Sequence, residues 1–134
     1  MYFPGGAGRV SPVDPFDVAS VARVVLTDQA YERQAFEVTG PELLTVGEMI
    51  AILSRVLGGP PIKYVDVPAS VTAEHFRRQG ASEVLAAAII ETLEGLRTGR
   101  FAYVAQTVER LTGRSGRTFE SWCRANAAAF TSEG

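Results

Sequence analysis

Residues 35–67 decide the fold, and they read AFEVTGPELLTVGEMIAILSRVLGGPPIKYVDV. Residues 45–48, TVGE, have the Thr-x-x-Glu form of a capping box, which predicts a helix beginning after Thr45. Apolar residues then recur at helical spacing for three turns, and Gly-Gly-Pro-Pro ends the pattern. The flanking segments 35–39 and 62–67 alternate apolar and polar residues, as strands do. A helix between two strands predicts a β-α-β unit with parallel strands.

The rest of the chain is expected to be mainly helical around this unit. The fold class is therefore α/β or α+β: a small two-strand parallel β-α-β unit with several packed helices, in a single domain of residues 1–134. The expected elements are a Gly/Pro-rich loop over 1–12, a helix capped by Asp17 and running to Leu26, helices over 69–79 and 82–97, partial helix over 101–111, a last helix from Ser115 or Thr118 through Phe130, and a flexible tail over 131–134.

Composition excludes several classes of protein. Cys123 is the only cysteine, so a disulfide scaffold is excluded. The formal net charge is −2, with no basic stripe, which argues against a nucleic-acid partner. The longest apolar run, residues 84–90, is far too short to cross a membrane, and the N-terminus has no features of a secretory signal. We therefore expect a cytoplasmic protein with neither membrane nor nucleic acid as a partner.

Several motifs together resemble one family. Residues 11–19 (SPVDPFDVA), 36–42 (FEVTGPE), 45–49 (TVGEM) and 57–64 (LGGPPIKY) occur in the order and spacing of the NmrA-like atypical short-chain dehydrogenases/reductases. Residues 111–119 (LTGRSGRTF) resemble the C-terminal motif of the same family. The resemblance covers most of the chain, from about residue 8 to residue 130, and it matches only the C-terminal, substrate-binding part of these proteins.

This resemblance implies that the N-terminal Rossmann half, with the Gly-rich turn that holds the cofactor pyrophosphate, has no counterpart here. Residues 5–9 (GGAGR) are the only glycine cluster, and the sequence predicts no strand before it, so it is expected to be a flexible loop. No cofactor is therefore predicted. Without the Rossmann half, strand edges and an apolar face would be uncovered, so the chain is expected to form a homodimer or to join a separate Rossmann-type chain.

Three residues are candidates for chemistry. His75 is the only histidine and lies on the helix that, in the family, helps to form the substrate pocket. Asp66 and Tyr64 share one side of the predicted strand 62–67, near the end where ligands of open α/β sheets bind. A helix cap and a half-buried tyrosine remain the alternatives for that pair, and a surface histidine on a charged helix remains the alternative for His75. No metal site is predicted, since one Cys and one His at unsuitable spacing cannot form it.

Two functions remain open from the sequence. The first is a cofactor-independent metabolic or natural-product enzyme that binds a small apolar metabolite and carries out a cyclisation, isomerisation or dehydration with His75, Asp66 and Tyr64. The second is a non-catalytic ligand-binding or protein-interaction subunit with a regulatory role. A truncated NAD(P)-dependent reductase is a third interpretation.

Overall fold

The N-terminal residues form strands in the computed structural model, which describes residues 1–131. Strand β1 (Tyr2–Phe3) pairs in parallel with β4 (Val65–Asp66), and β2 (Arg9–Val10) pairs antiparallel with β3 (Leu44–Thr45). The prediction of a loop over residues 1–12 is therefore wrong at residues 2–3 and 9–10, whereas residues 4–8 and 11–12 form no helix or strand. The glycine-rich composition of residues 1–12 could not reveal that both strands pair with segments more than 30 residues away along the chain.

A parallel two-stranded sheet is present, as expected, and its strand β4 lies within the predicted strand 62–67, but its partner is β1 instead of residues 35–39. Residues 34–40 form no regular secondary structure; Thr39 is buried, and its hydroxyl accepts a hydrogen bond from the amide of Ala105 at 2.8 Å. The predicted strand 35–39 is therefore wrong, and so is the β-α-β unit over 35–67. Alternation alone cannot form a strand, because a strand also needs a neighbour for its backbone groups, and no segment of the described chain pairs with this one.

Helix α2 (Val46–Leu57) confirms the clearest prediction. Thr45 accepts a hydrogen bond from the amide of Glu48, and the Glu48 carboxylate accepts one from the amide of Thr45 at 2.7 Å, which completes the capping box. That backbone hydrogen bond is the main reason why the pKa of Glu48 is lowered. Gly58 ends the helix in the left-handed conformation, with φ of 65°.

Helix α1 (Pro15–Thr27) begins three residues earlier than predicted. Its N-cap is Asp14, whose carboxylate accepts a hydrogen bond from the amide of Phe16 at 2.8 Å, and Pro15 occupies the first helical position. The assignment of Asp17 as the cap is therefore wrong. Asp17 is instead buried, and its carboxylate accepts a hydrogen bond from the amide of Arg117 at 2.6 Å, which ties α1 to the C-terminal part of the chain.

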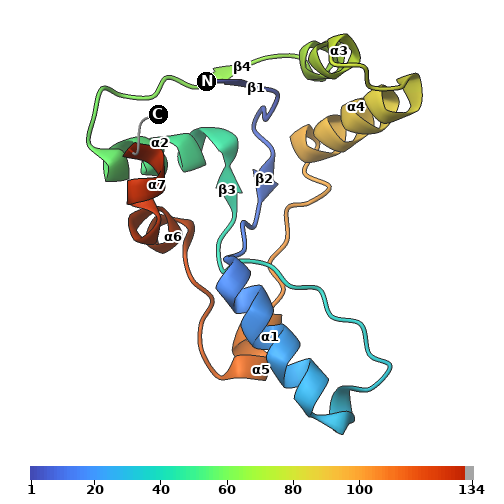
Figure 1. The fold of residues 1–134 in the computed structure, drawn as a ribbon, viewed down its shortest axis with the longest axis vertical. Coiled ribbons are helices and arrows are strands. Elements are labelled where there is room, and N and C mark those ends of the chain that lie inside the picture. The colour runs from blue at the N-terminus through green and yellow to red at the C-terminus, as the bar shows by residue number, and fades with distance from the viewer. Residues whose placement is uncertain (132–134) are drawn as a thin grey trace.

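The remaining helices follow the predicted order, and they pack in pairs (Figure 1). Helix α3 (Ala69–Arg78) packs on α4 (Glu83–Arg97), α1 packs on α5 (Thr107–Thr112), and α2 packs on α6 (Phe119–Ala125). The last predicted helix is interrupted at Asn126, so it forms two short helices. Thr131 ends the second of them, and residues 132–134 of the expected tail lie outside the described residues. The remaining bounds are η1 (Gln29–Tyr31, a 3-10 turn) and α7 (Ala127–Thr131).

The core is small for a chain of this size. Val46, Ile50 and Leu96 form its buried centre, joining α2 to the end of α4. The chain exposes 8670 Å² of surface, whereas a folded monomer of this mass is expected to expose about 6,800 Å². Large apolar side chains contribute to this excess, among them Leu26 and Val84, which are more than four-fifths exposed. The open arrangement of the elements in Figure 1 therefore leaves apolar surface exposed that a compact fold would cover.

Candidate functional site

An apolar groove of about 360 Å³ lies along the helical hairpin of α3 and α4. Gly80, with φ of 91°, ends α3, and the hydroxyl of Ser82 caps α4, so the two helices fold back on each other. Arg77 and Glu83 close the hairpin with an ion pair at 3.0 Å. The lining side chains come from the two helices and from β1: Phe3, Thr72, Phe76, Leu85, Ala88, Ile89, Thr92 and Leu93.

Two threonines supply the groove with side-chain polar atoms. The Thr92 hydroxyl donates to the carbonyl of Ala88 at 2.8 Å, so it is satisfied within its own helix. The Thr72 hydroxyl makes no hydrogen bond within residues 1–131, and it is therefore available to a ligand. The groove thus suits an apolar molecule that carries one hydrogen-bonding oxygen or nitrogen.

Next to the groove, the structure brings Tyr64 and Asp66 together, as the sequence predicted for one side of a strand. The Tyr64 hydroxyl donates to the carbonyl of Phe3 at 3.1 Å and accepts from the amide of Gly5 at 3.2 Å. Asp66 Oδ1 lies 3.4 Å from the same hydroxyl and accepts from the amide of Gly6 at 2.9 Å. Both side chains therefore hold the N-terminal segment whose Phe3 lines the groove.

Arg97 completes this cluster from the last turn of α4. Its guanidinium donates to Asp66 Oδ1 at 2.7 Å, so one carboxylate joins the end of β4, the glycine loop and the end of α4. The hydrogen bond from Arg97 is the main cause that lowers the pKa of Asp66, and the amide of Gly6 adds to it. Burial raises the pKa of Tyr64. An ionised aspartate and a protonated tyrosine, each already hydrogen-bonded, serve here to hold structure.

We expect the contribution of Asp66 to stability to depend on pH. Because its pKa is lowered in the folded chain, it stabilises the fold above the unfolded value of about 4 and ceases to do so as the pH falls through the folded value. Asp66→Asn should thus lower the free energy of unfolding at pH 7, and the difference from wild type should shrink on acidification. Urea titrations at several pH values test this.

The matched control is Glu109→Gln, which removes the same charge from a side chain with no hydrogen bond or ion pair in residues 1–131. A difference between Asp66→Asn and wild type that grows on acidification would contradict the assignment.

His75 does not take part in the hydrogen bonds of Tyr64 and Asp66. Its imidazole is exposed on α3, with Nε2 3.2 Å from Nε2 of Gln79 and the ring edge-on to Phe76. Phe76 lines the groove, and His75 is not one of the lining residues. Within residues 1–131, no hydrogen bond or ion pair connects His75 to Tyr64 or Asp66. The catalytic roles suggested for the three residues remain predictions.

The glycine cluster, expected to be a flexible loop, connects strands β1 and β2, and hydrogen bonds hold it in place. Strand β1 does precede it, but β2 follows instead of a helix, so a helix N-terminus for a pyrophosphate is missing from this turn. The amides of Gly5 and Gly6 already donate to Tyr64 and Asp66. Gly8 packs against the backbone of Leu96. This segment therefore does not fit a dinucleotide cofactor.

The described part of the chain gives little support for a metal site, a reactive thiol or a membrane-spanning helix. No group of three or more His, Cys, Asp or Glu side chains among residues 1–131 could hold a metal ion. Cys123 is fully buried in α6, and burial raises its pKa, so its thiol is protonated at neutral pH. None of the described helices combines the length and the apolar character that crossing a membrane requires.

Sequence reasoning missed Arg97 and the groove residues Phe3 and Thr72. Arg97 was visible only as a basic residue near a helix end, and its partner lies 31 positions away. Phe3 fell in a segment that was expected to be a loop. The helical spacing of Leu85 and Ile89 did indicate an apolar face, but it predicted a buried face, whereas Leu85 is half exposed in the groove.

Comparison with known proteins identifies the relatives. No family model matches the chain. It is 39% identical over 130 residues to an NAD(P)H azoreductase of Xenophilus azovorans, covering 97% of this chain and 45% of that protein. It is also 39% identical over 128 residues to a (4-alkanoyl-5-oxo-2,5-dihydrofuran-3-yl)methyl phosphate reductase of Streptomyces griseus, with 96% and 45% covered. The chain thus spans just under half the length of these curated relatives.

Solved structures show the same fold. An NADPH-dependent quinone oxidoreductase from Escherichia coli superposes with a TM-score of 0.76 at 19% identity, over 97% of this chain and 46% of that one. A nucleoside-diphosphate-sugar epimerase from Staphylococcus aureus gives 0.77 at 19% identity, over 92% and 43%. The chain is thus a homologue of NAD(P)H-dependent reductases. The resemblance to the C-terminal part of the NmrA-like reductases is confirmed, and the match to under half of each relative has the extent expected of that part alone.

Proposed function

We propose that this chain is the substrate-binding part of an NAD(P)H-dependent reductase and that it binds a small apolar organic molecule in the groove between α3 and α4. One observation carries the proposal: 39% identity runs through almost the whole chain in two reductases of different organic molecules. The groove residues on α3 and α4 lie within these matched 128 to 130 residues. Their apolar lining and the free Thr72 hydroxyl suit a conjugated molecule with a polar atom at one end.

Each residue of the site then has a physical role. Leu85 and Ile89 remove the substrate from water, and Thr72 donates a hydrogen bond that orients it. Tyr64 and Asp66 keep Phe3 in the groove wall through the hydrogen bonds described above. A bound nicotinamide would supply the reducing hydride, but residues 5–9 do not fit a dinucleotide. We therefore assign nucleotide binding to a Rossmann-type unit outside the described residues.

The exposed surface supports a partner for this chain. The chain exposes about a quarter more surface than a compact monomer of its mass is expected to expose. This extra area is larger than the roughly 800 Å² that one partner contributes to a standard interface. A homodimer and a Rossmann-type chain would each cover such a surface, and the expected homodimer stays a prediction, as does a cytoplasmic location. Sedimentation velocity of the purified chain decides between a monomer and a dimer.

A cofactor-independent cyclase, isomerase or dehydratase is less well supported. Tyr64 and Asp66 are engaged with backbone groups and with Arg97, and His75 is exposed on the outside of α3. General acid–base catalysis needs groups that face the same substrate atoms within hydrogen-bond reach. A non-catalytic ligand-binding or regulatory subunit would use the same groove, and only an activity measurement separates it from a reductase.

A chimera provides that measurement. In the Xenophilus azoreductase, the segment matched by this chain is replaced with the 134 residues, and NADPH-dependent reduction of azo dyes and quinones is followed at 340 nm. We expect reduction of at least one of these dyes or quinones. Nucleotide binding by the chimera is checked separately by fluorescence titration. A chimera that folds and binds NADPH but reduces none of the compounds would refute the proposal.

A further inference from the structure

A second hollow lies on another part of the molecule, between the start of α1 and the start of α6. It has a volume of about 230 Å³ and an almost wholly apolar lining. The aromatic rings of Phe119 and Trp122, stacked with centroids 5.9 Å apart, form part of its wall. Pro12, Val13 and Pro15 also line it, with Asp14, Arg117 and Thr118 as the remaining residues. We call this hollow the Trp122 slot.

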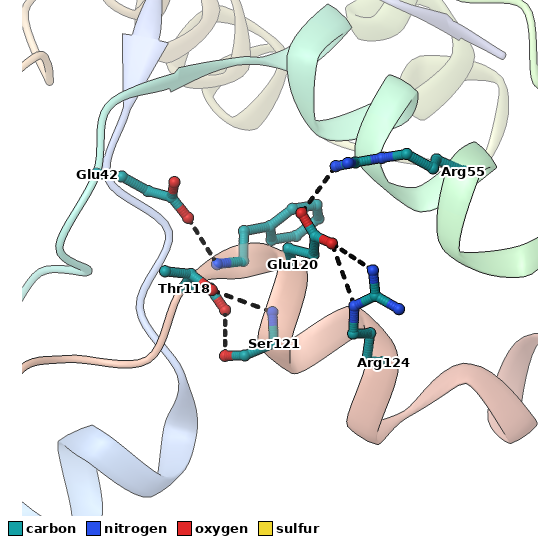
Figure 2. A network of polar contacts seen from close by, with 7 residues as sticks. Glu42, Arg55, Thr118, Glu120, Ser121 and Arg124 are labelled. Atoms are coloured by element: carbon teal, nitrogen blue, oxygen red, sulfur yellow. Dashed lines mark hydrogen bonds and ion pairs between the residues drawn. The ribbon is translucent and has the colours of Figure 1, made fainter.

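Hydrogen bonds and ion pairs hold the α6 wall of the slot in place. The Glu42 carboxylate accepts a hydrogen bond from the amide of Phe119 at 2.8 Å, and Thr118 caps α6 by accepting from the amide of Ser121 (Figure 2). Glu120 pairs with Arg124 at 2.6 Å and with Arg55 of α2 at 2.8 Å, which fixes α6 against α2 (Figure 2). A hollow held in this way needs little rearrangement to bind a ligand.

A cation with unused donors borders the slot. The Arg117 guanidinium is about half exposed and stacks over Phe16, with Cζ 5.1 Å from the ring centroid. It makes no hydrogen bond within residues 1–131, and its ion pair with Asp14 is long, at 3.7 Å. Asp14 is 6% exposed, and it already accepts from the amide of Phe16. The accessible charge at this site is therefore the positive one.

The space continues beyond Arg117. A neighbouring hollow of about 480 Å³ shares Asp14 and Arg117 with the slot and adds Phe16, Ser121, Ala125 and Asn126. The Asn126 side-chain amide donates to the carbonyl of Trp122 at 2.8 Å, which leaves the amide oxygen free of hydrogen bonds within residues 1–131. Polar groups thus lie beside the apolar slot, on the side where Arg117 stands.

We propose that the Trp122 slot binds a small aromatic carboxylate. The ring stacks in the apolar slot between prolines and aromatic side chains, and the carboxylate accepts hydrogen bonds from Arg117, which presents planar paired donors. The volume suits one or two rings, since a cavity of about 150 Å³ already holds benzene. This site shares no residue with the groove between α3 and α4, and the proposal stands independently of the proposed function.

The single tryptophan of the chain provides the readout. The full chain is titrated with phenylacetate and, in parallel, with its neutral analogue phenylacetamide, while Trp122 fluorescence is recorded. We expect saturable binding of both molecules, with phenylacetate about tenfold tighter because of the charge-assisted hydrogen bonds. Arg117→Gln should abolish this preference, because phenylacetate then loses its charge-assisted hydrogen bonds and binds no more tightly than phenylacetamide. Arg114→Gln, in the same loop but at a side chain with no hydrogen bond or ion pair in residues 1–131, should leave both affinities as in wild type.

Each other outcome counts against the proposal. The absence of a saturable fluorescence change, equal affinity for the two molecules, or an Arg114→Gln effect as large as that of Arg117→Gln would overturn it. Sedimentation in the same buffer covers the remaining possibility. If the chain dimerises and the slot binds phenylacetate only when the dimer is diluted apart, a second copy occupies this surface, and the proposal fails.

Discussion

Gly8→Ala is expected to destabilise the chain by about 3 kcal/mol or more, because the new methyl group has no space. A Cβ atom at Gly8 would lie 1.9 Å from the carbonyl oxygen of Leu96 and 2.6 Å from its carbonyl carbon. Both are backbone atoms near the end of α4, so no side-chain rotation can relieve the overlap. The N-terminal segment would have to move away from α4, and β2 and the Asp66 cluster would move with it.

Gly59→Ala is the matched control. It also replaces a glycine by alanine, but nothing lies within 4 Å of its Cβ position, and its φ is not in the left-handed region. We expect it to change the free energy of unfolding by less than about 1 kcal/mol, in either direction. Chemical denaturation of wild type and both variants measures the difference. Equal stability of Gly8→Ala and Gly59→Ala would show that the segment does not pack against α4 as described.

Ile89→Asp is expected to weaken ligand binding in the groove by about 100-fold, since an unpaired carboxylate in an apolar site costs several kcal/mol. Ile89 is half-buried and lines the groove together with Leu85 and Phe3. Equilibrium dialysis against azobenzene, a flat apolar molecule with two nitrogen acceptors, measures the affinity of the purified chain. Thermal unfolding followed by circular dichroism verifies that the variant is folded.

Val84→Asp introduces the same charge on the same helix outside the groove. Val84 is 82% exposed and is not a lining residue, so its replacement should leave azobenzene affinity within about twofold of wild type. If Ile89→Asp alone is unfolded, Leu85→Gln offers a milder polar change in the same wall. Wild-type affinity in a folded Ile89→Asp chain would exclude the groove as the binding site.

Local signals in the sequence were sufficient for most of the helices. The Thr45–Glu48 capping box, the Ser82 cap and the glycines after α2, α3 and α5 each act within a few residues of their own position, so the pattern and the structure agree there. The displaced start of α1, capped by Asp14 instead of Asp17, also had a local signal. Pro15 favours the first position of a helix, and the cap immediately precedes it.

The candidate site was only half predictable. The pairing of Tyr64 with Asp66 followed from residue spacing along a strand, which is a local property. The partners of the pair, Gly5, Gly6 and Arg97, lie 31 to 60 positions away, and nothing in their own surroundings indicates the contact. These contacts could not be predicted from the sequence because the partners lie far apart along the chain, and not because the local sequence preferences are weak.

The sequence by itself determined the apolar helices, their caps and the family to which the motifs point, because these depend on neighbouring residues and on their order. Only the tertiary structure decided which of the alternating segments becomes a strand and which segment pairs with it. Residues 35–39 and 62–67 both alternate, yet only the second contains a strand, Val65–Asp66, and its partner Tyr2–Phe3 lies more than 60 residues away. A strand is stabilised by the backbone groups of its neighbour, and which neighbour comes within reach is settled by the packing of the whole chain.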